Sequence, residues 1–461
     1  MRIAYVRGTF PKSSETFILE EIAYLIGAGH QVRIFSNWFD FQNLCDKAAN
    51  PEILGCVIYP DLVYDFSISN KLVSACKLIW NLRKKSYRTK FARDYFPAER
   101  NTKNFAKNNV FCIVARRVAA IFAKAMNFYV ISPYALKLKN FSLGLQQHKL
   151  HKTSFQPEHI HAPFLFKWDV SKMQSLVANF RDATYSVTLR SRDIYDRTAD
   201  ASYVSDRNKI IAGADRIFTI STNNRKHILE NFIVRGDIEV IHSSIDVAYF
   251  SGIKGRPTVP NRIVCVARLV PKKGHLVLLE ACKILRGKGH AFELIIVGAG
   301  PLMREIQSSI TALDLKSCVK LCGALPQSAV KSVLSTSVVC ALPCQIALDG
   351  DRDVLPNSLK EAMSMGVLVV TSRLPGIEEL VIDGKTGILC EPENAADLAD
   401  KLFYALQHPE QRVRICEHAR KKVEEQFDIK NEGRKFNNSL LHIREHARST
   451  IDQRNHLIFA S

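Results

Sequence analysis

Short apolar segments that alternate with amphipathic helical segments constrain this chain more than any other feature. Near its start, Arg2–Val6 and Gln31–Phe35 have the pattern of strands, and the apolar positions of Glu15–Gly27 follow a helical period. Strands that alternate with helices form parallel sheets whose faces the helices cover. The sequence therefore predicts an α/β protein.

The alternation occurs in two series, which a segment with glycine and proline at residues 251–260 separates. Further strand-like segments of the first series are His159–Ala162, Thr184–Thr188 and Asp215–Ser221. Those of the second series are Arg262–Val266, Glu293–Val297, Val319–Leu321, Val338–Leu342 and Val367–Thr371. Because 461 residues exceed what one core usually supports, we expect two Rossmann-like domains, at residues 1–250 and 261–420. A helix and a tail should follow at 421–461, and the tail, Arg448–Ser461, shows little periodicity.

The net charge of +19 is concentrated in one part of the first domain. Residues 71–150 contain 17 Lys and Arg but only 2 Asp and Glu, which gives this segment a net charge of +15. We expect a basic helical insert at about residues 70–150, too charged to span a bilayer. Cations beside aromatic side chains suit an anionic membrane surface, and a solvated helical face is the alternative. No recognisable nucleic-acid-binding motif accompanies the charge, so no nucleic-acid partner is expected.

The cysteines and the first residues bear on the compartment. Twelve cysteines are scattered without a CxxC pair, which favours buried free thiols and no metal site. The sequence starts directly with a strand-like segment and shows no secretory signal, so we expect a cytoplasmic protein. The basic insert would allow peripheral attachment to the inner face of the plasma membrane.

Cations follow the first strand of the second series. The segment Arg268–Gly274 contains Arg268, Lys272 and Lys273 and leads into a helical pattern. Ligands of open α/β sheets bind outside the carboxyl ends of the strands, where Arg and Lys suit a diphosphate. A solvated turn rich in lysine is the alternative for this motif taken alone.

Two glycines follow the next strand. Gly298 and Gly300 allow the backbone to approach a ligand closely or to make a tight turn. The third glycine of the dinucleotide fingerprint is missing, which argues against a nicotinamide-dependent dehydrogenase.

The segment Asp353–Glu361 lies between two predicted strands and contains the change from loop to helix. Pro356 suits the first turn of a helix, so Asp353 should lie in the loop and Glu361 in the helix. The N-terminus of a helix favours phosphate, and carboxylates on either side of it could bind the hydroxyls of a sugar and a ribose. The alternative is that Asp353 caps the helix and Glu361 is a surface residue.

These three motifs, in this order, resemble the retaining glycosyltransferases of family 4, which have the GT-B architecture of two facing Rossmann-like domains. The pair Asp353 and Glu361, with seven residues between them, matches that family's acidic pair. Gly366, Gly376–Leu380 and Gly384–Gly387 extend the likeness. The first residues, with Phe10–Pro11 and Ser14–Ile18, are similar to the colanic-acid and exopolysaccharide branch of the family.

The resemblance implies a role for each matching residue. Arg268 and Lys273 would bind the diphosphate of a nucleoside-diphosphate-sugar, which is a donor substrate and not a cofactor. Glu361 would bind the ribose hydroxyls and Asp353 the hydroxyls of the donor sugar. Backbone N–H groups near Val354 and Leu355 would assist. No metal is implied, because cations and a helix terminus stabilise the departing diphosphate.

Three positions depart from the family's pattern. Asp353 stands where the family usually has Glu, Arg190 stands where it usually has His, and Pro163 replaces the second histidine of a His-Ala-His-Phe pattern. Arg190 remains a hydrogen-bond donor at the reaction centre but cannot act as a base near neutral pH. His161 is a candidate for the acceptor side, with a structural histidine as the alternative. Glu15 and Thr16, at the first junction of loop and helix, are expected to face the cleft.

The resemblance thus implies a hexosyltransferase-type enzyme that retains the donor's anomeric configuration. Its acceptor would be a glycan, in particular a lipid-linked glycan, in surface or exopolysaccharide biosynthesis. A catalytically weak or inactive relative that binds nucleotide or a partner transferase is the main alternative. A basic nucleic-acid-binding protein and another sugar-nucleotide enzyme are the remaining ones.

Overall fold

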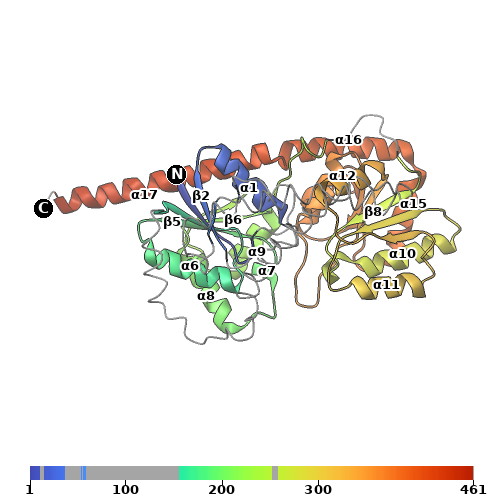
Figure 1. The fold of residues 1–461 in the computed structure, drawn as a ribbon, viewed down its shortest axis with the longest axis horizontal. Coiled ribbons are helices and arrows are strands. Elements are labelled where there is room, and N and C mark those ends of the chain that lie inside the picture. Colours follow the sequence, from blue (N-terminus) through green and yellow to red (C-terminus); the bar gives the residue numbers. More distant parts are fainter. Residues whose placement is uncertain (11–14, 37–52, 54–55, 59–154, 252–257, 460–461) are drawn as a thin grey trace, which may run out of the picture. The chain divides into compact units, whose positions relative to one another are not determined.

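The computed structural model describes residues 1–10, 15–36, 53, 56–58, 155–251 and 258–459 (Figure 1). These residues fall within one compact unit formed by residues 1–60 and 155–461. The basic insert expected at about residues 70–150 lies outside the described residues, as does most of the linker at 251–260. The expectations about these two segments therefore stay predictions.

The first sheet has seven parallel strands in the order β3-β2-β1-β4-β5-β6-β7. Its strands are β1 (Arg2–Val6), β2 (Gln31–Phe35), β3 (Val57–Ile58), β4 (His159–Ala162), β5 (Thr184–Leu189), β6 (Arg216–Thr219) and β7 (Ile238–Val240). The central strand β1 pairs on both sides, since Ile3 lies opposite Val32 of β2 and His159 of β4. The predictions for β1, β2 and β4 match to the residue, whereas β3 and β7 were not predicted.

The second sheet has six parallel strands in the order β10-β9-β8-β11-β12-β13. Its strands are β8 (Arg262–Val266), β9 (Glu293–Val297), β10 (Val319–Leu321), β11 (Val339–Leu342), β12 (Leu368–Ser372) and β13 (Ile388–Cys390). The strands of this sheet are almost wholly apolar and buried because helices cover both faces. All but the short edge strand β13 were expected.

Helices complete the two layers around each sheet. In the first domain they are α1 (Thr16–Gly27), α6 (Lys167–Asn179), α7 (Arg192–Tyr195), α8 (Ala201–Gly213) and α9 (Thr222–Asn231). In the second they are α10 (His275–Gly287), α11 (Met303–Ala312), α12 (Gln327–Thr336), α13 (Asn357–Ser364), α14 (Ile377–Leu380), α15 (Ala395–Gln407) and α16 (Pro409–Gln426). Figure 1 shows α10 and α11 on one side of the second sheet and α12 and α16 on the other. The two sheets and their helices confirm the expected α/β class.

The last helix, α17 (Ile429–Phe459), returns to the first domain, where it packs on α1 and β5 (Figure 1). Phe436, Leu440 and Ile443 enter the core formed by β1, α1 and β2. The segment that was expected as a tail with little periodicity, Arg448–Ser461, is helical as far as Phe459. Phe436, Leu440 and Ile443 lie on one face of the first half of α17, and this half packs on the first domain.

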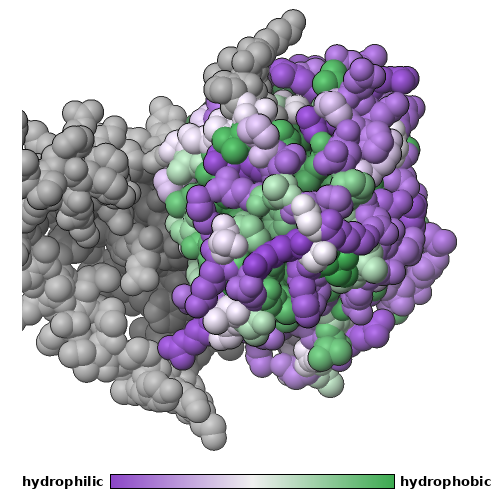
Figure 2. Space-filling model, turned by 90° about the vertical axis from the view of Figure 1, so that its right-hand side faces the viewer, coloured by the Kyte–Doolittle hydropathy of each residue, from purple (hydrophilic) through white to green (hydrophobic). Residues whose placement is uncertain are grey.

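The surface and the thiols are those of an ordinary globular protein. The face of the second domain in Figure 2 is largely hydrophilic, with hydrophobic residues toward its middle. Within the described ranges, no helix has the length and apolarity needed to cross a bilayer. All nine cysteines of these ranges are free, as expected; six of them are buried, and Cys322 is exposed.

Candidate functional site

The second sheet changes direction between β8 and β11. From β8 the chain proceeds to β9 and β10 on one side, and it returns to β11 on the other side of β8. Such a switch point, at the carboxyl ends of the strands, is where open α/β sheets bind ligands. The loop after β8, which includes the 3₁₀ helix η2 (Pro271–Lys273), and the loop after β11 meet there.

Backbone contacts hold these two loops together. Gln345 N donates to the carbonyl oxygen of Lys272 at 2.9 Å. Gly274, with a φ of 66°, follows η2, and a Cβ at this position would lie 1.8 Å from the carbonyl oxygen of Pro343. Glycine is required here because any side chain would collide with backbone. The close approach brings the lysines of one loop to the carboxylates of the other.

Two lysines and two aspartates form an ionic cluster at this point. Lys273 Nζ lies 2.7 Å from Asp353 Oδ2, and Lys272 Nζ lies 3.0 Å from Asp351 Oδ1 and 3.8 Å from Asp353 Oδ1. The Cys344 thiol also donates to Asp353 Oδ2, at 3.5 Å. The sequence motifs indicated Lys273 and Asp353, but not that Asp351, Lys272 and Cys344 complete the cluster.

The cluster is charged at neutral pH. Burial alone would raise the pKa of Asp353, but Lys273 and then Lys272 outweigh it, and the pKa is lowered. Burial would also lower the pKa of Lys273, but Asp353 raises it above its usual value. The side chains of Lys273 and Asp353 are 13% and 14% exposed, so protein covers most of each.

Gly298 and Gly300, after β9, allow their loop to pack closely against the loop that follows β8. A Cβ at Gly298, whose φ is 150°, would lie 1.8 Å from the carbonyl oxygen of Ala267, and one at Gly300 would lie 2.4 Å from that of Leu269. This backbone contact supports the loop that carries Arg268, which is exposed. The glycines thus shape the site through close packing of backbone.

Helix α13 begins beside the cluster. Pro356 is its N-cap, one residue before the helical turn in which it was expected, and Glu361 lies in the helix and is buried. Val354 and Leu355, between Asp353 and the helix, are also buried. Gly376 approaches Val354 so closely that a Cβ would lie 2.6 Å from its Cγ1. The order of carboxylate, helix terminus and second carboxylate is as the sequence indicated.

Arg190 follows β5 and is buried. Its Nε donates to the carbonyl oxygen of Pro163 at 3.0 Å, and its guanidinium lies 4.4 Å from the centroid of the Phe17 ring. Arg190 Nη2 lies 3.6 Å from Glu21 Oε2. Burial lowers the pKa of Arg190, and Glu21 offsets part of that effect. The position where the resemblance expects a histidine thus holds a fixed, charged donor.

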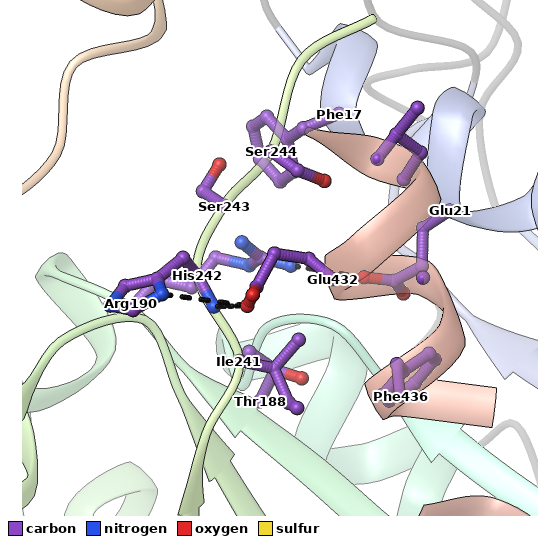
Figure 3. Close-up of a pocket in the computed structure, with 12 residues that line it drawn as sticks. Phe17, Glu21, Thr188, Arg190, Ile241, His242, Ser243, Ser244, Glu432 and Phe436 are labelled. Carbon is purple, nitrogen blue, oxygen red and sulfur yellow. Dashed lines mark hydrogen bonds and ion pairs between the residues drawn. The ribbon is translucent and has the colours of Figure 1, made fainter. Parts of the chain in front are cut away.

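Arg190 also lines a small cavity of about 20 Å³, enough for one water molecule (Figure 3). In the figure, Arg190, His242 and Glu432 lie close together, with Glu21 and Phe17 on neighbouring elements. Glu432 accepts a hydrogen bond of 2.7 Å from His242 N. Neither His242 nor Glu432 carried a sequence signal, because their segments are brought together only by the return of α17.

His161, the candidate for the acceptor side, lies in the interior of the first sheet. It is fully buried in β4, where Nδ1 shares a 2.9 Å hydrogen bond with Ser186 and Nε2 lies 3.3 Å from Thr188 Oγ1. Burial lowers its pKa well below the usual value, and His159 and Arg190 lower it further. Its burial favours the alternative of a structural histidine, and the acceptor role stays a prediction.

Glu15 accepts hydrogen bonds from Arg7, a residue that the sequence motifs did not predict to be part of a site. Arg7, directly after β1, donates to Glu15 from Nε at 2.9 Å and from Nη2 at 2.7 Å. Its Nη1 donates to Asp169 Oδ2 at 3.1 Å. Thr16, the first residue of α1, is partly exposed. The binding partners of Arg7 are far apart in sequence, which is why no spacing revealed them.

Comparison with known proteins now adds to this geometry. Residues 250–422, which contain the ionic cluster and α13, match the family model of glycosyl transferases group 1. The amylovoran biosynthesis glycosyltransferase AmsK of Erwinia amylovora is 28% identical over 442 residues, which cover 93% of this chain and 96% of the relative. Residues 250–422 thus resemble the group 1 glycosyl transferases, and the whole chain is similar to a relative named as a glycosyltransferase.

A second similar protein is the putative colanic acid biosynthesis glycosyltransferase WcaL of Escherichia coli. It is 32% identical over 239 residues, and the match covers 51% of the chain and 59% of the relative. Both relatives bear out the expected likeness to the exopolysaccharide branch.

Solved structures confirm the architecture of this chain. A glycosyltransferase from Rickettsia africae superposes with a TM-score of 0.61 at 19% identity and covers 97% of this chain and 98% of its own. HepE from Anabaena, solved in complex with UDP-glucose, gives a TM-score of 0.63 at 14% identity, with 96% and 100% covered. The fold is therefore GT-B, as expected.

Proposed function

We propose that this chain transfers a sugar from a nucleoside-diphosphate-sugar to a hydroxyl group of a glycan, with retention of the donor's anomeric configuration. The observation that carries the proposal is the pairing of Lys273 with Asp353 at the switch point, beside the start of α13. A lysine ammonium group next to a helix N-terminus suits a diphosphate.

In this proposal the donor lies along the carboxyl edge of the second sheet. Lys273 and Arg268 bind the diphosphate, Asp353 binds hydroxyls of the sugar, and Glu361 binds those of the ribose. When the bond between the sugar and the diphosphate breaks, negative charge grows on the departing group. Lys273 and the N–H groups at the start of α13 stabilise that charge, which lowers the barrier without a metal or a cofactor.

The acceptor is the less constrained part of the proposal. The names of AmsK and WcaL connect those proteins with amylovoran and colanic acid biosynthesis, and a glycan of an exopolysaccharide is therefore the acceptor class that we propose. Lipid-linked growth of such a glycan on the inner face of the plasma membrane would agree with a cytoplasmic enzyme and with the basic segment at 71–150.

The test is isothermal titration of the purified chain with nucleoside diphosphates and their sugars. We expect binding by the wild type, weaker binding by Lys273→Ala and Glu361→Ala, and unchanged binding by Lys288→Ala. Lys288 is the matched control, because it pairs with Asp400 on the surface of the same domain. If the wild type binds none of these ligands, the proposed donor site is wrong.

A further inference from the structure

Lys360 is a buried cation that the proposed reaction does not use. It lies in α13 directly before Glu361, and its side chain is fully buried. Its Nζ donates to the carbonyl oxygen of Ser243 and lies 5.5 Å from the centroid of the Phe427 ring. Burying an ammonium group is costly unless it is hydrogen-bonded or paired, so a lysine at this place calls for a physical reason.

The two partners of Lys360 belong to the segments that connect the domains. Ser243 follows β7 on the way to the second domain, and Phe427 joins α16 to α17, which returns to the first. The segments also pair with each other, since Ile245 N donates to the carbonyl oxygen of Phe427, and Ile429 N to that of Ile245, both at 3.0 Å. Lys360 thus contacts both connections at the point where they meet.

A second contact ties the same helix to the same segment. Ser243 Oγ donates to Asn357 Oδ1 at 3.1 Å, and Asn357 is the first residue of α13. Helix α13 is therefore held to the connecting segment at its start by Asn357 and one turn later by Lys360. The proposed donor residues Asp353 and Glu361 lie just before this helix and within it.

The charges around Lys360 come from four places. The pKa of Lys360 is lowered to about 7, first by burial and then by Arg190 after β5. Glu361 of α13, Glu20 of α1 and Glu432 of α17 act in the opposite direction. The ammonium is thus balanced between one cation and three carboxylates.

We propose that Lys360 is a positioning residue that holds α13 to the two connecting segments and thereby sets the affinity of the donor site. The hydrogen bond to Ser243 and the contact with Phe427 fix the helix that carries Glu361. Without them, the helix shifts relative to the cluster of Lys273 and Asp353. This inference rests on the proposed donor site for its binding readout but not for its structural one.

The structural readout is hydrogen exchange of the full chain. Lys360→Met removes the ammonium and keeps most of the apolar volume. Lys172→Met is the matched control, because Lys172 is a buried lysine of α6 whose Nζ lies 5.7 Å from the centroid of the Phe35 ring. We expect faster exchange in α13 and in residues 243–245 only in Lys360→Met. Equal exchange of these segments in wild type and Lys360→Met would overturn the inference even if no nucleotide binds.

The binding readout is titration with a nucleoside diphosphate. We expect Lys360→Met to bind about tenfold more weakly than wild type, and Lys172→Met to bind as wild type does. If wild type binds no nucleoside diphosphate, the proposed function fails and hydrogen exchange alone decides this inference. If wild type and Lys360→Met bind equally well, α13 does not depend on Lys360 and the inference is wrong.

The pH dependence separates the charge from the volume of the side chain. The protonated amine is attracted by the three carboxylates and is the stronger donor to Ser243, so wild-type affinity should fall as the pH rises through about 7. Lys360→Met should lack this step. Because titration of the ligand is common to both proteins, the ratio of their affinities isolates Lys360. A constant ratio between pH 6 and 8.5 would contradict the role of the ammonium.

Discussion

The two sheets carry similar charges at their switch points but use them differently. In the first sheet the order reverses between β1 and β4, and there Arg7 meets Glu15 and Asp169. In the second it reverses between β8 and β11, where Lys273 meets Asp353. The side chains of Arg7, Glu15 and Asp169 are 4%, 11% and 0% exposed, and those of Lys273 and Asp353 are 13% and 14% exposed.

The two clusters differ in how many hydrogen-bond donors of the cation are already bound to protein. The guanidinium of Arg7 gives Nε and Nη2 to Glu15 and Nη1 to Asp169, and it lies 4.6 Å from the centroid of the Phe164 ring. A guanidinium group whose N–H groups donate to two carboxylates and whose face is covered by an aromatic ring has few donors left to bind a ligand. An ammonium group with one close carboxylate can exchange that partner for a phosphate. The first cluster therefore stabilises its domain, and the second is suited to binding.

The largest effect should follow from breaking the first cluster. Arg7→Met leaves Glu15 and Asp169 buried without a cation, which should lower the free energy of unfolding of this domain by about 3–5 kcal/mol. Urea unfolding measures it. The control is Lys167→Met, which breaks the exposed pair with Asp200 and should cost less than about 1 kcal/mol. Similar losses in the two variants would contradict the structural role of Arg7.

Removing the cation of the second cluster should change binding more than stability. We expect Lys273→Ala to weaken the binding of a nucleoside diphosphate about 10- to 100-fold, because a charge-assisted hydrogen bond to phosphate is lost. Titration calorimetry measures the affinity, and urea unfolding should show a smaller loss than that of Arg7→Met. A variant that is strongly destabilised but binds as wild type does would reverse the comparison.

Removing the carboxylate of the second cluster should have the opposite sign. Asp353→Asn frees Lys273 from its partner, so a nucleoside diphosphate without sugar should bind about threefold more tightly. Turnover of the nucleotide-sugar should fall, because the proposed ligand of the sugar hydroxyls has changed. Asp400→Asn, on the surface of the same domain, is the control. Weaker binding of the diphosphate by Asp353→Asn would show that Asp353 does not compete for Lys273.

The smallest effect on donor binding is expected from Arg190→His. Arg190 shares the Phe164 ring with Arg7 and pairs with Glu21, outside the ionic cluster. Donor affinity should stay within about twofold of wild type, because Arg190 lies outside the ionic cluster and acts on α13 only through its charge on Lys360. Turnover should fall as the cation facing Glu21 is lost. An increase in turnover from an almost inactive wild type would instead favour the alternative of a weakened transferase.

The sequence predicts the elements with a clear period and the motifs with close spacing. Strands β8 and β9 are long enough for their apolar pattern to define both ends, and Asp353 and Glu361 lie within one loop and helix. Strand β13, with three residues, was missed, although β10 of the same length was predicted.

The contacts that join distant segments could not be predicted. Arg7 and Asp169 are separated by 162 positions, and Lys360 and Ser243 by 117. His161 illustrates the same limit, because its motif matched the family while its burial depends on strands and a helix that come later in the chain. The spacing of residues in a sequence predicts which side chains lie close together in one loop or helix. The burial of a side chain depends on distant segments that meet only in the folded protein.

The return of α17 has a consequence for biosynthesis. Domains of a growing chain generally fold in the order in which they leave the ribosome. Here the core of the first domain contains Phe436, Leu440 and Ile443, which are translated after the whole second domain. Until they emerge, the nascent first domain carries an open apolar groove on α1. The first domain to be translated is therefore the last to be completed, and shortening the chain before residue 436 should expose it to chaperones and proteases.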